Sequence, residues 1–318
     1  MSKITVIGMG SVGSTIAYKL ASDMTASEIV LIDIRSEKAM GEAMDIRQGL
    51  AFTGGVDIYA GSYEDAVGSD IVIITSGVAR KEGQSRLDLV KTNFGIIMDI
   101  MPKIVSACPD AKYIIVSNPV DILTYAFHKY SGLKENQIIG SGTILDTIRL
   151  RERIAECYDI NSQSVHAYVM GEHGNSSFVP WSLANVSGIP VDEYEENLID
   201  FKGVTVPLDH ADAEEYVRVS GAKVIARKGA TFYAVSLCAC QLCKCILSDT
   251  RSVLTVSTLL KGEYGIEDVC LSTCAIVGKD GIEGKIKVTL TDDELAKLKA
   301  SADTLKSVIA QVMPEENK

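Results

Sequence analysis

The chain is short of positive charge and lacks the segments that direct a protein to or across a membrane. Its 318 residues hold 31 lysines and arginines against 42 aspartates and glutamates, a net charge of −11, which argues against nucleic acid and anionic membranes as partners. Its apolar runs are short or interrupted by charge, so we expect no membrane span. The N-terminal MSKITVIGMGSVG has no basic stretch followed by an apolar run and a cleavage site. These absences predict a cytoplasmic protein that binds small ligands.

Cysteine is present, but not in the spacing of a metal site. Eight cysteines without a secretion signal indicate free thiols in a reducing compartment. Four of them, Cys238, Cys240, Cys243 and Cys245, lie in SLCACQLCKCILSD, where neither a histidine nor a second well-spaced pair supports a zinc site. The surrounding KGATFYAVSLCACQLCKCILSD has a helical pattern in which cysteine serves as a small apolar residue. We therefore expect a helix there and no bound metal.

The first 140 residues contain short apolar strands that alternate with amphipathic helices. Strand patterns occur at KITVIGMG, EIVLIDI, VDIYAG, DIVIITSG and AKYIIVSNPV, and helix patterns at SVGSTIAYKLASD, SEKAMGEAMDIRQGLAF, RLDLVKTNFGIIMDIMPKIVSA and DILTYAFHKYSG. Near-continuous apolar strands separated by such helices predict a parallel sheet covered on both faces, which is a doubly wound α/β fold.

Beyond residue 140 the pattern changes. A long charged helix, TILDTIRLRERIAECY, is followed by further helices and by hairpin-like stretches such as GKIKVTLT. We place a domain boundary at this point, with a doubly wound domain at 1–140 and a mixed α+β domain at 141–318. The chain has no internal repeat or low-complexity linker, so we expect the two domains to pack closely.

A glycine-rich turn near the N-terminus predicts a dinucleotide site. Gly8, Gly10 and Gly13 form GMGSVG between a strand and a helix, the context in which such a turn lets the backbone approach a pyrophosphate at a helix N-terminus. Asp33 ends the second strand, 20 positions past Gly13, where its carboxylate would accept hydrogen bonds from the adenosine ribose and repel the extra phosphate of NADP. The pattern favours NAD, although Arg35 leaves NADP open.

Three residues in the second half have the chemistry needed to reduce a 2-oxo acid. Asp146 and Arg149, in LDTIR, are three apart on a predicted helix and share a face. Arg149 would bind a substrate carboxylate through two parallel hydrogen bonds, and Asp146 would orient a histidine and stabilise its protonated form. His173, in MGEHGNSS, follows a predicted strand and is placed to offer its ring to a cleft.

These motifs resemble those of the lactate/malate dehydrogenase superfamily along essentially the whole chain. GMGSVG, ARKEGQSRLDL, SNPVD, LDTIR, GEHGNSS and KGAT occur in the expected order. By this resemblance His173 corresponds to the proton donor and acceptor, Asp146 to its partner and Arg149 to the carboxylate anchor.

The resemblance also assigns three further residues. Arg86 corresponds to a loop arginine that polarises the substrate carbonyl when the loop closes, which would expel water before hydride moves. Asn118 corresponds to the residue that contacts both nicotinamide and substrate, and Thr231 to a wall of the pocket.

The residue at position 80 leaves two substrates open. Arg80 matches the family position that selects the far end of the substrate, where lactate enzymes usually have glutamine and malate enzymes arginine. An arginine facing the methyl group of pyruvate would be a desolvated charge without a partner, unless it reached water or Glu82. SGTILD, GEHGNSSFVPWS and KGAT nevertheless resemble the bacterial lactate enzymes better. We favour lactate, with malate as the alternative.

Two other residues match positions at which bacterial lactate enzymes bind fructose 1,6-bisphosphate between subunits. Arg151 lies two positions past Arg149, about 200° round the helix, and therefore faces away from the active site. His166 precedes His173 by seven residues, roughly 23 Å along an extended strand. The resemblance implies a homotetramer activated by that effector, and the alternative is an ordinary surface arginine and strand histidine.

A non-catalytic NAD(H)-binding protein on the same scaffold is the rival from another class. That hypothesis expects one or more of the four reactive positions to have been lost, whereas Arg86, Asp146, Arg149 and His173 are all present. The sequence shows neither a suitably placed carboxylate pair for a glycosidase nor an activated serine or cysteine for a protease.

Overall fold

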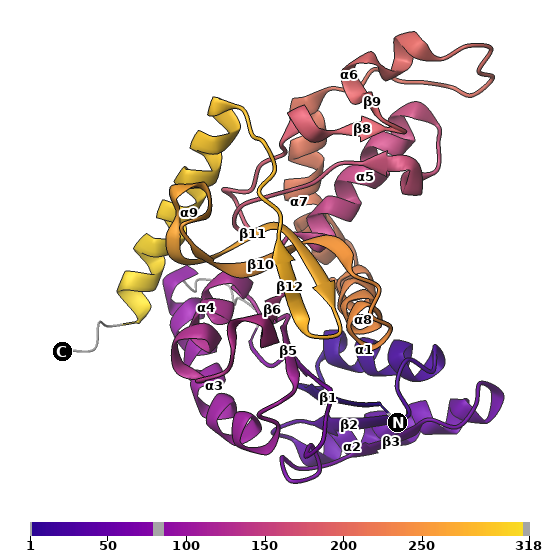
Figure 1. Cartoon of the computed structure of the whole chain (residues 1–318). Coiled ribbons are helices and arrows are strands. Elements are labelled where there is room, and N and C mark those ends of the chain that lie inside the picture. Colours follow the sequence, from indigo (N-terminus) through magenta and orange to yellow (C-terminus); the bar gives the residue numbers. More distant parts are fainter. Residues whose placement is uncertain (1, 79–85, 314–318) are drawn as a thin grey trace.

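The computed structural model describes residues 2–78 and 86–313. At the centre of this part of the chain lies a nine-stranded sheet (Figure 1). Strands from the first half pair in parallel in the order β3-β2-β1-β4-β5-β6. Their bounds are Lys3–Ile7 (β1), Glu28–Ile32 (β2), Asp57–Ala60 (β3), Ile71–Ile74 (β4), Lys112–Ile115 (β5) and Ile138–Gly140 (β6). The strand order reverses between β1 and β4, as in dinucleotide-binding folds, and the predicted doubly wound sheet is confirmed.

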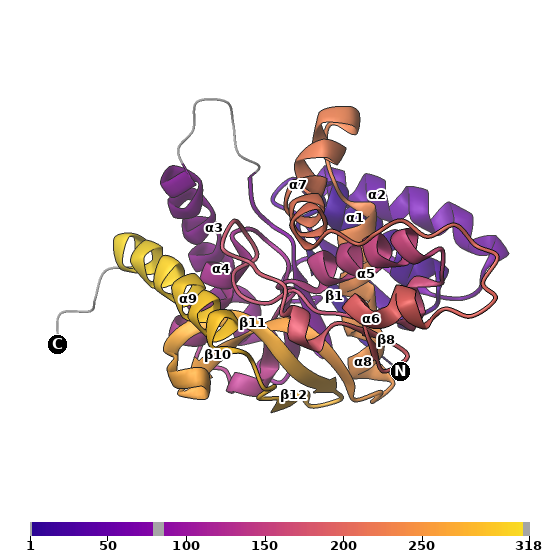
Figure 2. The same cartoon turned by 90° about the horizontal axis from the view of Figure 1, so that it is seen from above.

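Helices cover both faces of this sheet, and the strands supply apolar side chains to each (Figure 2). The helices α1 (Ser11–Ser22) and α2 (Ser36–Gly49, continued by the 3₁₀ turn η1, Leu50–Phe52) lie on one face, and α3 (Arg86–Ala107) and α4 (Val120–Tyr130) on the other. Side chains alternate along each strand. In β1, for example, Ile4 and Val6 pack toward α1, whereas Ile7 packs toward α3 and α4. This two-sided burial explains why the strands are apolar almost throughout.

The second half of the chain extends the same sheet. Strands β10 (Ser252–Lys261), β11 (Glu267–Gly278) and β12 (Gly281–Lys285) add antiparallel to β6, where Ser257 pairs with Gly140. The predicted hairpin at GKIKVTLT is only partly correct, because β12 ends at Lys285 and the following residues are irregular.

Helices and a small sheet complete the mixed second half. The helices are α5 (Ile144–Tyr158), α6 (Val191–Tyr194), α7 (His210–Lys228), α8 (Tyr233–Leu247) and α9 (Asp292–Val312), and the small antiparallel sheet comprises β7 (Val165–His166), β8 (Asn185–Val186) and β9 (Ile189–Pro190). Short 3₁₀ turns lie at Glu135–Gln137 (η2), Ser162–Ser164 (η3), Trp181–Leu183 (η4), Glu195–Asn197 (η5) and Glu263–Gly265 (η6).

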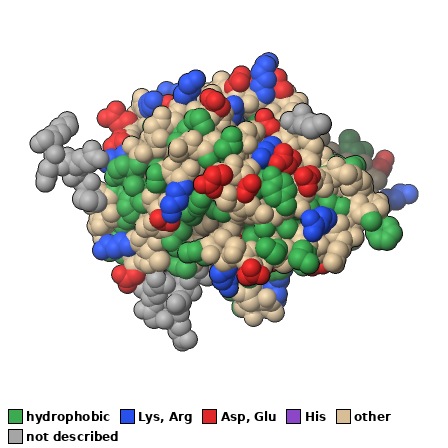
Figure 3. Space-filling model, turned by 90° about the horizontal axis from the view of Figure 1, so that it is seen from below, with side chains coloured by type: hydrophobic (Ala, Val, Ile, Leu, Met, Phe, Trp, Pro, Cys, Tyr) green, Lys and Arg blue, Asp and Glu red, His purple; other side chains and the backbone are tan. Residues whose placement is uncertain are grey.

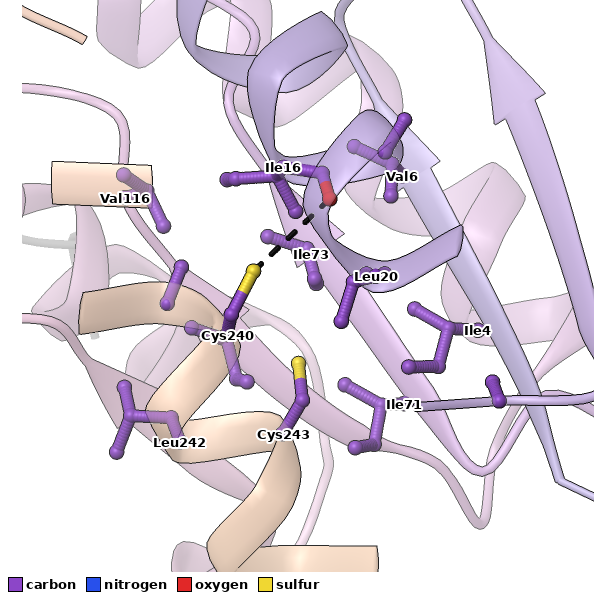
Figure 4. Packing of buried hydrophobic residues seen from close by; sticks show 14 of the residues in the cluster. Ile4, Val6, Ile16, Leu20, Ile71, Ile73, Val116, Cys240, Leu242 and Cys243 are labelled. Atoms are coloured by element: carbon purple, nitrogen blue, oxygen red, sulfur yellow. Dashed lines mark hydrogen bonds between the residues drawn. The ribbon is translucent and has the colours of Figure 1, made fainter. Parts of the chain in front are cut away.

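The cysteine-rich helix α8 packs against α1 in the largest apolar cluster. Figure 4 shows Cys240 and Cys243 among Ile16, Leu20 and Ile71. All eight cysteines are buried and free, so their thiols occupy core positions. The predicted helix is too long at its start, because α7 ends at Lys228 and α8 begins only at Tyr233. The left-handed backbone of Gly229, with φ of 84°, ends α7 and separates the two helices.

The described residues place limits on metal and membrane sites. No group of three or more histidine, cysteine, aspartate or glutamate side chains in this part of the chain is arranged to hold a metal ion. Among the same residues, no helix combines the length and apolarity needed to cross a bilayer. On the face seen from below in Figure 3, acidic and basic side chains are interspersed with apolar ones, so charge of one sign does not dominate that face.

Candidate active site

The glycine-rich turn lies where β1 ends and α1 begins, and two of its glycines have no substitute. Gly8 has φ of 101°, and a Cβ there would come within 2.7 Å of the Ser76 backbone nitrogen. A Cβ on Gly13 would collide with the carbonyl oxygen of Gly8. Gly10, by contrast, precedes α1 as its N-cap and borders open space. The turn is therefore tightly packed at Gly8 and Gly13 and open at Gly10, so a ligand can approach its backbone closely.

A cavity of about 830 Å³ opens in front of this turn and reaches the end of β2. Asp33 lines it beside Gly8 and Gly10. The Asp33 carboxylate accepts hydrogen bonds from the backbone N–H groups of Met9 (2.6 Å) and Arg35 (2.9 Å). These two bonds fix the carboxylate at the end of β2, beside the glycine-rich turn.

The sequence-predicted trio in the second half converges at one place. His173 Nδ1 lies 2.6 Å from Asp146 Oδ2, and Arg149 donates to Asp146 Oδ1 at 3.1 Å. Asp146 and Arg149 come from the first two turns of α5, while His173 follows the isolated bridge between Gly171 and Ser272 of β11. One carboxylate thus contacts both an imidazole and a guanidinium.

Burial and charge oppose each other at this trio. Burial alone raises the pKa of Asp146, but His173 and Arg149 lower it by more, so the pKa lies below its ordinary value. Burial lowers the pKa of His173, but the Asp146 carboxylate raises it by more, with a smaller contribution from Asp121, and the pKa ends above its ordinary value. The arrangement favours an imidazolium and can hold a proton for transfer.

A second cavity, of about 400 Å³, joins the trio to the cofactor cavity. Asn118, Arg149, His173 and Thr231 line it, as the sequence analysis predicts for a shared pocket. The two cavities have residues in common at the end of β4, namely Thr75, Gly77 and Val78. A ligand in the second cavity therefore meets one in the first.

Two buried polar residues that support this site, Asn93 and Asp121, were not predicted from the sequence. Asn93 of α3 accepts from the Val78 N–H at 2.8 Å and donates to the Asn118 carbonyl at 2.7 Å. Asp121, in the first turn of α4, accepts from the His173 backbone N–H at 2.8 Å. Asp121 gave a signal as a lone acid in the apolar run VDIL, whereas Asn93 follows the polar Lys91 and Thr92 and gave none.

The remaining predicted residues lie elsewhere or outside the described part. Arg80 is outside the described residues; α3 begins at Arg86, but the side chain of Arg86 is also outside them. Arg151 lines neither of these two cavities. Its Nε donates to the Ala167 carbonyl at 3.0 Å, and it lines a separate cavity of about 610 Å³. His166, next to Ala167, is exposed at the end of β7.

A parallel sheet with this strand order, and a dinucleotide cleft that opens onto a protonatable histidine, define an NAD-dependent dehydrogenase. Two family models match, the lactate/malate dehydrogenase NAD binding domain over residues 2–140 and the lactate/malate dehydrogenase alpha/beta C-terminal domain over residues 143–316. The chain belongs to the lactate/malate dehydrogenase family.

Relatives and solved structures match nearly the full chain. An L-lactate dehydrogenase of Acetivibrio thermocellus is 45% identical, covering 97% of this chain and 96% of its own. L-lactate dehydrogenase 1 of Clostridium acetobutylicum is 44% identical, covering 98% of both. The structure of a minor L-lactate dehydrogenase from Enterococcus mundtii matches with a TM-score of 0.92 and 38% identity, covering 99% of both chains. Each of these proteins is named as a lactate enzyme.

Replacing Asp33 by asparagine tests the cofactor cleft. The substitution keeps the shape of the side chain but removes the charge that we expect to bind ribose hydroxyls and to repel a ribose phosphate. We expect NADH affinity to fall roughly tenfold and the ratio of NADPH to NADH affinity to rise, measured by nucleotide fluorescence titration. Asp57→Asn, at an exposed carboxylate that begins β3, is the control and should bind as the parent does. An unchanged affinity ratio in Asp33→Asn would contradict this assignment.

Proposed function

We propose that this chain is an L-lactate dehydrogenase, which interconverts pyruvate and NADH with L-lactate and NAD. The observation that carries the proposal is the His173–Asp146–Arg149 arrangement in a cavity continuous with the dinucleotide cleft. The names of the relatives, at 44–45% identity over almost the whole chain, support lactate over malate.

The residues of the substrate cavity divide the reaction between them. Bound NADH supplies the hydride. Arg149 binds the carboxylate of pyruvate and so fixes its orientation. His173, with its Nδ1 committed to Asp146, uses Nε2 to donate a proton to the carbonyl oxygen as reduction proceeds, and the same nitrogen accepts the proton in the reverse direction.

Other residues complete the cavity. Asn118 and Thr231 line it and would contact the substrate and the nicotinamide. By family resemblance, Arg86 would polarise the carbonyl from the N-terminus of α3. The cis peptide between Asn118 and Pro119 directs the chain from β5 into α4 beside this cavity.

The division into two domains and the cellular location of the protein are part of the same proposal. A domain boundary at residue 140 is supported by the two family models, because the NAD binding domain model ends at residue 140 and the C-terminal domain model begins at residue 143. A cytoplasmic location is supported by the eight free thiols, which a reducing compartment preserves.

Replacing His173 by asparagine separates a dehydrogenase from a protein that only binds NAD(H). We expect the variant to bind NADH normally in fluorescence titration but to lose about 10²- to 10⁴-fold in kcat, because the proton donor is gone. His210→Asn is the matched control, since His210 stacks on Trp181 at the start of α7 and does not line either cavity. A His173→Asn enzyme that turns over at the parent rate would rule out the proposed mechanism.

Comparing pyruvate with oxaloacetate on one preparation tests the choice of substrate. We expect kcat/KM to be higher for pyruvate, and Arg80→Gln to raise the pyruvate-to-oxaloacetate ratio further, because an arginine at that position suits a second carboxylate. A preference of the parent for oxaloacetate by roughly 100-fold, which one polar contact can produce, would replace lactate by malate. An unchanged ratio in the variant would remove Arg80 from the specificity.

We also propose a homotetramer activated by fructose 1,6-bisphosphate at Arg151 and His166. The bond from Arg151 to the carbonyl of Ala167 brings the guanidinium to the chain segment that carries exposed His166. Apolar side chains border the same cavity and are exposed, namely Ile148 (49%), Leu237 (53%) and Val253 (40%). Such a surface is typical of one that a second subunit covers.

The effector proposal is tested by titrating fructose 1,6-bisphosphate into a pyruvate assay at acid and neutral pH. We expect the parent rate to rise, and Arg151→Gln to keep the unactivated rate while losing most of the rise, since the sugar phosphates lose a cation. Arg153→Gln is the control, because Arg153 instead pairs with Glu156 on the exposed side of α5. A parent rate that stays flat throughout the titration would eliminate the effector, and sedimentation velocity would test the tetramer separately.

A further inference from the structure

Asp121 has a buried carboxylate near the substrate cavity, and both of its oxygens accept hydrogen bonds. Its side chain belongs to the first turn of α4 and the residue is 2% exposed. Oδ2 accepts the backbone N–H of His173 at 2.8 Å, and Oδ1 accepts the hydroxyl of Ser257 at 2.5 Å. Both donors are neutral groups, a main-chain N–H and a hydroxyl, and neither carries a charge that would balance the buried carboxylate.

Through these bonds, Asp121 of α4 connects strand β10 to the segment that carries His173. It lies three residues after Asn118, which lines the substrate cavity. Ser257 belongs to β10 at the point where that strand pairs with β6. His173 is therefore held at two ends by carboxylates, with its ring on Asp146 and its main chain on Asp121.

We propose that Asp121 is a positioning residue for the reaction, whose ionised carboxylate fixes the main chain of His173 and, with Asp146, stabilises the imidazolium. This inference rests on the proposed function, in which His173 is the proton donor. It differs from the role of Asp146, because Asp121 of α4 bonds the main chain of His173, whereas Asp146 of α5 bonds its ring.

The charges around the two groups determine how they titrate. Burial raises the pKa of Asp121 to about 6, although the Ser257 hydroxyl and the His173 N–H lower it; the charge of His173 also lowers it, and that of Glu172 raises it. Burial lowers the pKa of His173, Asp146 and Asp121 raise it, and Arg149 lowers it. The Asp121 charge that favours imidazolium is thus present above about pH 6 and is lost as the pH falls through that value. The two titrations are coupled.

Asp121→Asn removes the charge and keeps the shape, because an amide oxygen still accepts the His173 N–H and the amide nitrogen can donate to Ser257. We expect the pKa of His173 to fall, so that the basic limb of kcat/KM for pyruvate moves to lower pH. On that limb kcat/KM falls roughly tenfold for each unit of the shift. Below about pH 6 the parent loses the same charge, and the two profiles should converge. NADH affinity should not change.

Ser257→Ala removes a hydrogen bond and leaves the carboxylate. Because the Ser257 hydroxyl lowers the pKa of Asp121, its loss should raise that pKa, and activity should fall near neutral pH but match the parent at alkaline pH. This is the opposite pH dependence to Asp121→Asn. Thr255→Val is the control, since it removes a buried hydroxyl on the same strand that bonds Thr147 instead, and it should keep the parent profile.

The pKa of His173 can also be read without turnover, from the imidazole Cε1–H signal in NMR titrations, assigned with His173→Asn among the four histidines of the chain. A lowered pKa in Asp121→Asn supports the inference. A pKa and pH profile equal to those of the parent, or a loss that is the same at every pH, would overturn it. If the pKa shifts but the parent reduces neither 2-oxo acid, the proposed function fails and the inference about His173 stands. Should Asp121→Asn not fold, Ser257→Ala decides alone by the same two measurements.

Discussion

The bond between the His173 ring and the Asp146 carboxylate is the interaction on which the rest of the site depends. Burial opposes a charged imidazole, and the neighbouring carboxylate restores its proton affinity. The carboxylate is itself costly to bury, and His173 and Arg149 together offset that cost. Each member of the trio therefore makes the charge of another tolerable, and removal of one would leave a buried charge uncompensated.

The sheet brings this trio to the cofactor because its parallel strands end at one edge. The glycine-rich turn follows β1, Asn118 follows β5, and α5 with Asp146 follows β6. The antiparallel strands of the second half extend the same sheet, and the bridge between Gly171 and Ser272 attaches the His173 segment to β11. Both halves of the site therefore share one rigid support, which is what catalytic geometry requires.

Local patterns predicted the parts of the site whose partners lie nearby in sequence. The GMGSVG turn and the LDTIR face each depend on spacing within one turn or helix. The contact of His173 with Asp146 spans 27 residues. The chemistry predicted a histidine beside Asp146, but only the family resemblance identified that histidine as His173. Asn93 and Asp121 escaped notice because a polar residue in a helix looks ordinary until its distant partner is known. The helix at KGAT was predicted too long because apolar periodicity continued through the break at Gly229.

The helix α3 begins at Arg86 and carries Asn93, whose side chain lies between the two cavities. Asn93 uses its amide to bond Val78, which borders both cavities, and to bond the carbonyl of Asn118. Arg86 is the first residue of the same helix, seven positions earlier, roughly 10 Å along the axis. The anchor at Asn93 therefore sets where α3 starts relative to both ligands. A substitution at this asparagine would therefore move the start of α3 relative to both cavities.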